Sequence, residues 1–162
     1  MIAVIQRCSR ANVKIDQNIV GQIGNGLVIL LGVKKDDNEE DADFLVRKVS
    51  GLRIYNDSND KMNLSIRDVH GSALVISQFT LCGDTKKGRR PSFIHAAPPK
   101  EGQRLYEYFI SSLLKEGIPV ESGEFGAMMD VELVNEGPAT FILNSNCLLY
   151  TSPRPRDATL AR

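Results

Sequence analysis

The run LVILLGV, Leu27 to Val33, constrains the fold more than any other stretch of this sequence. A strand with one solvent-exposed face alternates apolar and polar residues, whereas this run is apolar throughout apart from its glycine. It therefore predicts a central strand that is covered on both faces. The remainder of the chain must supply a sheet around this strand and the layers that cover it.

Two segments have the periodicity of covering helices. Apolar residues recur at helical spacing after the acidic run Asp36 to Asp43, which predicts a helix over 39–51 with acids near its positive end. The acidic run is better explained as this solvated helix start than as a metal or acid–base cluster. A second amphipathic pattern runs from Leu105 to Leu114 and is ended by Gly117 and Pro119.

The other apolar segments are short and rich in β-branched residues, which is typical of strands. Strands and helices mix without regular βα alternation, so we expect an α+β fold with mostly antiparallel sheet. Two strands should close the domain, on either side of Gly137 and Pro138. The other predicted strands are Ile2–Arg7, Asn12–Asp16, Ile19–Ile23 and Ser72–Leu81.

The chain has 162 residues, with 20 basic and 20 acidic residues and no net charge. This length suits one domain. Contact with a nucleic acid would need a local basic patch, because the body as a whole is not basic. No segment predicts a signal peptide or a membrane span, so we expect a cytoplasmic protein without a membrane partner.

The cysteines and histidines argue against disulfide and metal chemistry. Cys8, Cys82 and Cys147 lie far apart and are odd in number, which favours reduced thiols. With only His70 and His95 in addition, a zinc site has few possible ligands. We expect no metal and no cofactor.

The C-terminal segment 145–162, SNCLLYTSPRPRDATLAR, has two prolines and no sustained periodicity. These properties predict a disordered tail, which could be foreign to the domain. We therefore place the folded domain at 1–144.

Polar residues at the end of a buried strand indicate a site, and Ser77 and Gln78 are such residues. Thr80 could serve as a nucleophile beside a base, but threonine is also a common strand residue. Arg7 lies within a strand pattern, where a covered arginine needs a partner and an outward-facing one does not. The loop residues Lys86, Lys87, Arg89 and Arg90 could contact phosphate or could simply be solvated.

The pair Gly137–Pro138 fits no favoured hairpin turn, since two-residue hairpins prefer Asn-Gly or Asp-Gly. Proline gives up an amide donor, so Pro138 must lie at an edge, a bulge or an unusual turn. Few X-Pro bonds in folded proteins are cis, so the residues alone favour a trans bond here.

Two separated motifs resemble the signatures of the D-aminoacyl-tRNA deacylase family: SQFTL at Ser77–Leu81 and NEGPAT at Asn135–Thr140. We refer to them as the first and the second motif. The stretches MIAVIQR, GRRPSF and FGAMMDVELVNEGP resemble the family at matching intervals, and the resemblance covers residues 1 to about 144. Ala139 departs from the family pattern, which has a larger β-branched residue there.

The resemblance implies a barrel-like, layered core with two main helices. It also implies an enzyme that hydrolyses the ester between a D-amino acid and the 3′ end of tRNA, in a homodimer with active sites at the subunit interface. The bond between Gly137 and Pro138 would be cis, and its rigid backbone would enter the partner's pocket. An L side chain would collide with that backbone, whereas glycine would be poorly rejected.

The same resemblance assigns roles to single residues. Arg7 would hold the Gly-Pro element. Met129 would line the adenosine pocket, or else be an ordinary residue of the hydrophobic core. Hydrolysis would use Thr80, or else the terminal tRNA hydroxyl and a water. Ser77, Gln78, Phe79 and Thr80 would form the catalytic pocket, with backbone amides near Phe79 binding the carbonyl.

Two other functions stay open on the sequence. A related editing deacylase would have a trans Gly-Pro bond and a wider pocket that accepts an L-amino acid. A non-catalytic RNA-binding protein would use the basic loop Lys86–Arg90 alone.

Overall fold

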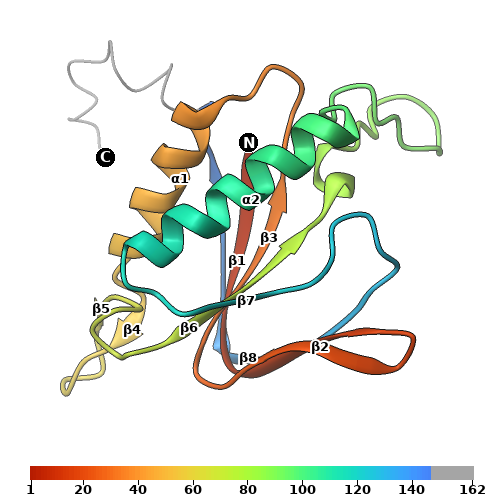
Figure 1. The fold of residues 1–162 in the computed structure, drawn as a ribbon. Coiled ribbons are helices and arrows are strands. Elements are labelled where there is room, and N and C mark those ends of the chain that lie inside the picture. Colours follow the sequence, from red (N-terminus) through yellow and green to blue (C-terminus); the bar gives the residue numbers. More distant parts are fainter. Residues whose placement is uncertain (147–162) are drawn as a thin grey trace, which may run out of the picture.

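Strand β3 (Gly26–Gly32) lies at the centre of the sheet in the computed structural model, which describes residues 1–146 (Figure 1). The sheet order is β2-β1-β3-β6-β7, and β8 pairs with β1. The prediction of a central, doubly covered strand is confirmed, because β3 is buried almost throughout. The other elements are β1 (Ile2–Ile15), β2 (Asn18–Ile23), α1 (Glu39–Gly51), β4 (Tyr55–Asn56), β5 (Met62–Leu64), β6 (Ser72–Ser77), the 3-10 helix η1 (Phe79–Cys82), α2 (Pro99–Lys115), β7 (Val120–Ser122) and β8 (Asp130–Asn144).

The sheet has a separate apolar cluster on each face. One cluster joins the sheet to α1 and α2, which lie side by side over one face (Figure 1). The other is enclosed by β1, β2, β6 and β8, because the sheet curls until β2 approaches β7. This confirms an α+β fold with a barrel-like core. Strand β1 is antiparallel to β2, β3 and β8, whereas β3, β6 and β7 run parallel.

Helix α1 begins and ends where the sequence predicts, at residues 39 and 51. The Asn38 side chain accepts from the Glu40 amide at 3.0 Å, and the Asp41 carboxylate accepts from the Asn38 amide at 2.9 Å. These reciprocal bonds satisfy amides that have no partner within the helix. The acidic run is therefore a helix start in the structure.

Two strand predictions need correction. The predicted strands Ile2–Arg7 and Asn12–Asp16 are one strand, β1, because β8 pairs with it along nearly its whole length. The predicted strand Ser72–Leu81 ends at Ser77, and the chain then turns into η1. Sequence periodicity missed this end because Phe79–Leu81, after the polar Gln78, are again residues typical of strands.

Ser145 belongs to the folded domain, although we expected the tail to start there. It is 2% exposed, and its amide donates to the Met1 carbonyl at 2.9 Å. The rest of the expected tail, 147–162, lies outside the described residues. Within the described chain, no helix is both long and apolar enough to span a membrane.

Candidate active site

The first motif stands where the parallel strands β3 and β6 end. Ser77 pairs with Leu31, and the Gln78 amide still donates to the Leu31 carbonyl at 2.8 Å. Helix η1 then begins at Phe79, and the Leu81 amide donates to the Gln78 carbonyl at 3.2 Å. The first amides of a helix have no acceptor within it, so the amides of Phe79 and Thr80 are suited to bind an external oxygen.

The polar side chains of this motif contact each other. Gln78 Nε2 donates to Thr80 Oγ1 at 3.1 Å, and Thr80 is exposed. No carboxylate or imidazole in the described part of the chain forms a hydrogen bond with this hydroxyl. Thr80 therefore has no base in contact with it.

The second motif forms a bulge within β8, not a turn between two strands. Thr140 pairs with Gln6 and Asn135 pairs with Cys8, so residues 136–139 stand against Arg7 alone. We refer to Glu136–Ala139 as the Gly-Pro loop. The expected pair of closing strands is thus a single strand that pairs with β1 before and after the loop. The sequence left a bulge open as one of three positions for Pro138, but it could not choose between a bulge and a turn, because both use the same residues.

Asn135 closes the Gly-Pro loop through its side-chain amide. Its Oδ1 accepts from the Ala139 amide and its Nδ2 donates to Thr140 Oγ1, each at 2.8 Å. Asparagine commonly bonds to the backbone a few residues further on at turns, and this local signal in the sequence would have identified the role.

Asn135→Ala should therefore lower the free energy of unfolding by about 1 kcal/mol, since both bonds are lost from a partly exposed site. Asn135→Asp keeps the acceptor for the Ala139 amide, so it should lower the free energy of unfolding by less. Urea denaturation of the three proteins measures both differences. Equal losses for the two variants would contradict the assignment.

Arg7 fixes the Gly-Pro loop through hydrogen bonds from its guanidinium. It is 7% exposed, and its Nε and one terminal nitrogen donate to the Glu136 carbonyl at 3.0 and 2.8 Å. The other terminal nitrogen donates to the Ile54 carbonyl at 2.7 Å. The planar guanidinium thus ties the loop to the segment before β4. No sequence signal points to Ile54, because its contribution is a backbone atom.

Gly137 takes a φ of +91°, which disfavours side chains, and a Cβ there would collide with the Arg7 guanidinium. No peptide bond in residues 1–146 is cis, so the bond between Gly137 and Pro138 is trans. This corrects the cis bond implied by the family resemblance and agrees with the preference expected from the residues alone.

Two titratable groups are buried near the loop. Loss of hydration on burial raises the pKa of the Cys8 thiol to about 11, so this cysteine stays protonated at neutral pH and is a poor nucleophile. Burial also raises the pKa of Tyr55, whose hydroxyl has no hydrogen-bond partner in the described structure.

The two motifs do not meet within this chain. Ser77 pairs with Leu31 and Leu31 with Ala3, whereas the Gly-Pro loop faces Arg7 on β1. Across the strands, the step from β6 to β8 covers three spacings of about 4.8 Å each. Along the strands, the step from Ala3 to Arg7 covers four residues of about 3.3 Å each. The two steps are perpendicular, so the motifs lie roughly 20 Å apart along the sheet.

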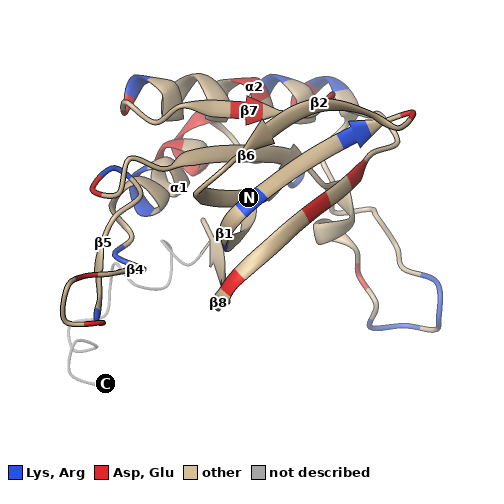
Figure 2. Ribbon diagram, turned by 90° about the horizontal axis from the view of Figure 1, so that it is seen from below, with Lys and Arg blue, Asp and Glu red and all other residues tan. Residues whose placement is uncertain are grey.

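The remaining candidate residues lie apart from these motifs or at their edge. Met129 packs against the apolar cluster enclosed by β1, β2, β6 and β8, which agrees with a core role. The basic loop Lys86–Arg90 follows η1 and projects from the body, with its basic residues at its end (Figure 2). His95 lies 3.6 Å from the Asp84 carboxylate at the base of this segment.

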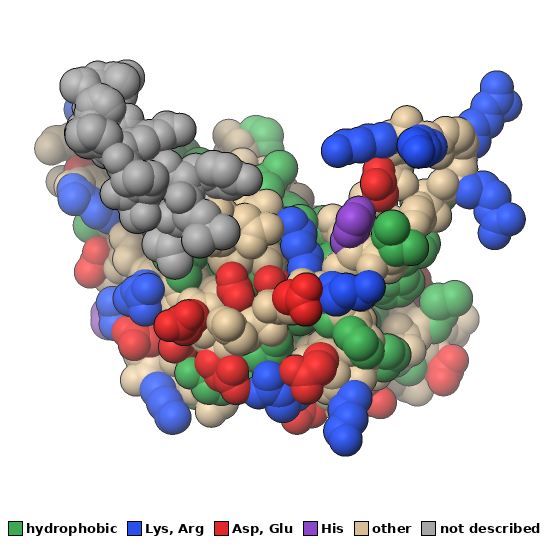
Figure 3. All heavy atoms as spheres, turned by 90° about the horizontal axis from the view of Figure 1, so that it is seen from above, with side chains coloured by type: hydrophobic (Ala, Val, Ile, Leu, Met, Phe, Trp, Pro, Cys, Tyr) green, Lys and Arg blue, Asp and Glu red, His purple; other side chains and the backbone are tan. Residues whose placement is uncertain are grey.

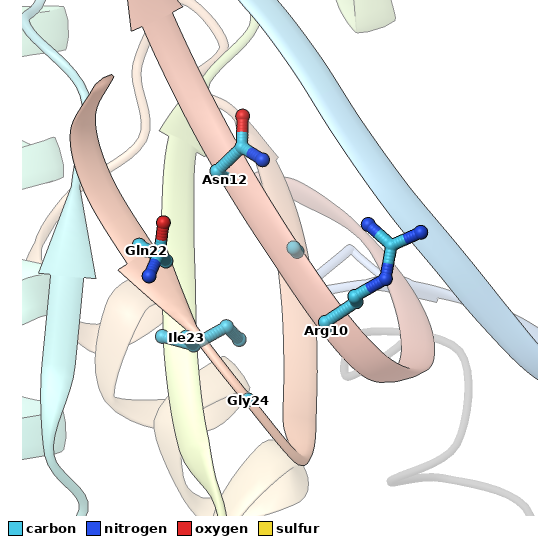
Figure 4. Close-up of a pocket in the computed structure, with 6 residues that line it drawn as sticks. Arg10, Asn12, Gln22, Ile23 and Gly24 are labelled. Carbon is cyan, nitrogen blue, oxygen red and sulfur yellow. The ribbon is translucent and has the colours of Figure 1, made fainter.

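A shallow pocket of about 400 Å³ lies elsewhere, between β1 and β2 (Figure 4). Its lining includes Arg10, Asn12 and Gln22, and neither motif contributes to it. In the described residues, no three side chains of histidine, cysteine, aspartate and glutamate gather as a possible metal site.

The fold and the site define an α+β domain whose candidate active site offers main-chain amides and a backbone loop held by arginine. The family described as D-Tyr-tRNA(Tyr) deacylase matches residues 4–144. The chain belongs to this family.

Individual relatives cover nearly the whole chain. A D-aminoacyl-tRNA deacylase of Thermotoga petrophila is 53% identical over 148 residues, which are 91% of this chain and 99% of the relative. The protein of the same name from Geobacter sulfurreducens is 56% identical over 145 residues, covering 90% and 95%.

Two solved structures are similar in fold. The structure titled c-Myc DNA unwinding element binding protein has a TM-score of 0.83 at 34% identity, covering 89% of this chain and 98% of its own. A probable eukaryotic D-amino acid tRNA deacylase has a TM-score of 0.78 at 17% identity, covering 88% and 98%, and supports the fold alone.

Proposed function

We propose that this protein hydrolyses the ester bond of D-aminoacyl-tRNA and releases the free D-amino acid and tRNA. The observation that carries the proposal is the identity of 53% and 56% to the two deacylases, over about nine-tenths of the chain. Both motifs lie within the matched residues 4–144. The substrate partner is thus the 3′ end of tRNA, and no cofactor is required by the proposal.

The amides of Phe79 and Thr80 are the proposed donors to the scissile carbonyl. They begin η1, and donors fixed before the reaction stabilise the negative charge that develops on the carbonyl oxygen. The Thr80 hydroxyl accepts from Gln78 and contacts no base in the described chain. This arrangement favours attack by water, assisted by the terminal tRNA hydroxyl, over attack by Thr80.

A complete site would need two subunits. The Gly-Pro loop and the first motif of one chain are roughly 20 Å apart along the sheet, too far to line one small pocket. Strand β8 has one hydrogen-bonded neighbour among the described strands, and it exposes Val134 (38%) and Ile142 (73%). An exposed apolar edge strand is available for contact with a second copy, and in the proposed homodimer each Gly-Pro loop reaches the first motif of the partner.

Selection by backbone explains the proposed preference for D substrates. Arg7 and Asn135 fix the Gly-Pro loop, so an L side chain directed at it would be excluded by contact. Glycine has no side chain to exclude, so glycyl-tRNA should be hydrolysed as well. The selection needs a rigid main chain and no particular side chain on the loop.

A second candidate function has one observation in its favour. The trans bond before Pro138 is the geometry expected of the editing relative that accepts L-aminoacyl-tRNA. Because the two relatives of 53% and 56% identity are D-aminoacyl-tRNA deacylases by name, we place this candidate second.

Incubation with D-tyrosyl-tRNA, L-tyrosyl-tRNA and glycyl-tRNA separates these functions. We expect loss of the D-tyrosyl and glycyl esters and survival of the L-tyrosyl ester. Cleavage of the L ester would support the second candidate. Survival of all three esters, with tRNA still bound, would support a non-catalytic RNA-binding protein that uses the basic loop.

A further inference from the structure

Phe79 of the first motif forms an exposed pair with Phe93, which lies outside the motif. The rings of Phe79 and Phe93 lie edge to face, with centroids 4.9 Å apart and an angle of 63° between their planes. Phe79 is 57% exposed and Phe93 is 37% exposed, and the neighbouring Ile94 is 66% exposed. Large apolar side chains are usually buried, so a cluster of exposed ones indicates a surface that binds something.

The segment that carries Phe93 is held in place at its base. The amides and carbonyls of Asp84 and Ser92 exchange hydrogen bonds of 2.7 and 2.9 Å. The Phe93 ring rests against Gly83, where a Cβ would come within 3.1 Å of the ring. The aromatic pair is therefore a fixed surface that needs little ordering when a ligand binds.

The basic loop Lys86–Arg90 lies between the two phenylalanines in the sequence. Its lysines and arginines are exposed, and none of them forms a salt bridge with any residue in 1–146. Figure 3 shows basic side chains at the end of a loop that stands away from the body. The Asp84 carboxylate at the base accepts from the Lys86 amide at 3.0 Å, which is the main reason that its pKa is lowered.

Exposed aromatic rings and unpaired cations on one segment are a combination that binds single-stranded nucleic acid, because bases stack on the rings and phosphates meet the cations. A protein partner would have to be acidic and apolar at the same place. The single-stranded end of tRNA meets both requirements, and it is attached to the ester that the first motif would cleave.

We propose that Phe79 and Phe93 form a stacking surface for the unpaired cytidines that precede the terminal adenosine, with the basic loop on their phosphates. The proposal rests on the proposed function for the identity of the RNA. It adds a binding site for nucleotides upstream of the reacting one, in which Phe93 positions the substrate and takes no part in the chemistry.

Three substrates of increasing length test this site: the D-tyrosyl ester of adenosine, the D-tyrosyl ester of the trinucleotide CCA, and D-tyrosyl-tRNA. Phe93→Leu keeps an apolar side chain but removes the ring, and it should raise KM about 10-fold for the trinucleotide and the tRNA, as expected for one lost base stack. KM for the adenosine ester should stay within about 2-fold of the wild type, because this substrate has no upstream base.

Phe44→Leu is the matched control, since Phe44 is a partly buried phenylalanine on α1. It should leave KM for all three substrates unchanged. An equal effect of Phe93→Leu on all three substrates, or no effect on any, would overturn the proposal. So would a change in oligomeric mass by sedimentation, because the pair would then be a subunit contact.

A direct binding measurement keeps this test separate from the proposed activity. If the wild type cleaves none of the esters, the proposed function fails, and the stacking surface is judged on an uncharged, fluorescently labelled tRNA minihelix ending in CCA. Phe93→Leu should weaken its binding about 10-fold by fluorescence anisotropy. Unchanged affinity would overturn the stacking surface independently.

Discussion

Arg7→Lys is expected to lower kcat/KM for D-tyrosyl-tRNA by about 100-fold, the size of loss that a small misplacement of a site can cause. The guanidinium donates to the carbonyls of Glu136 and Ile54 in two directions at once. A lysine ammonium is a compact charge on a flexible stem and cannot keep this planar arrangement. The Gly-Pro loop would then lose the support that fixes its position.

Single-turnover deacylation measures this loss, and Arg10→Lys is the matched control. Arg10 lies on the same strand but is exposed, so its replacement should change the rate little. Gly137→Ala should reproduce the loss by another route, because its Cβ would displace the Arg7 guanidinium. Near-normal turnover of both Arg7→Lys and Gly137→Ala would show that the loop has no part in the reaction.

Arg7→Lys should lower the free energy of unfolding only modestly, although it lowers kcat/KM strongly. A buried carbonyl left without a donor costs about 1–3 kcal/mol, but the lysine can still reach one of the two carbonyls. Thermal unfolding followed by circular dichroism would separate a folded, inactive variant from an unfolded one. A variant that unfolds at room temperature would make Arg7 a residue of the core and not of the site.

The elements that periodicity predicted well are those whose environment is local. Helix α1 has its cap, its acids and its apolar stripe within one segment, so its bounds followed from the sequence. The central strand β3 was evident because an unbroken apolar run allows few other places in a sheet. Polar residues at the end of a buried strand, Ser77 and Gln78, indicated a candidate site, and its chemistry stays a prediction.

The arrangement of the site depends on contacts that are distant in the sequence. The separation of the two motifs follows from the strand order β6-β3-β1-β8, which no local pattern encodes. The bond from the Arg7 side chain to the Ile54 carbonyl joins residues 47 positions apart. The bulge that makes β8 one strand is fixed by its register with β1, which Gly137 and Pro138 do not reveal by themselves.

The start of the chain is part of the same long-range framework. The α-ammonium of Met1 is fully buried, lies 2.8 Å from the Asp37 carboxylate, and donates to Ser145 Oγ at 2.9 Å. Ser145 Oγ in turn donates to Asp41 at 2.7 Å. This network joins the first residue of the domain, the start of α1 and the end of β8. It explains why Ser145 is ordered although its own segment has no apolar pattern.

Asp37→Asn should therefore destabilise the protein by about 3–5 kcal/mol, the usual cost of leaving one member of a buried ion pair without its partner. The asparagine Oδ1 can still accept from the Lys34 amide, which donates to Asp37 at 2.6 Å, so the loop before α1 keeps its shape and mainly the charge is lost. Asp36→Asn is the control, because the neighbouring Asp36 is exposed and forms no part of the ion pair. Asparagine also tolerates the φ of +70° at this position. Urea denaturation gives both free energies of unfolding. If the two variants lost the same small amount of unfolding free energy, the ion pair between the Met1 ammonium and the Asp37 carboxylate would contribute nothing to stability.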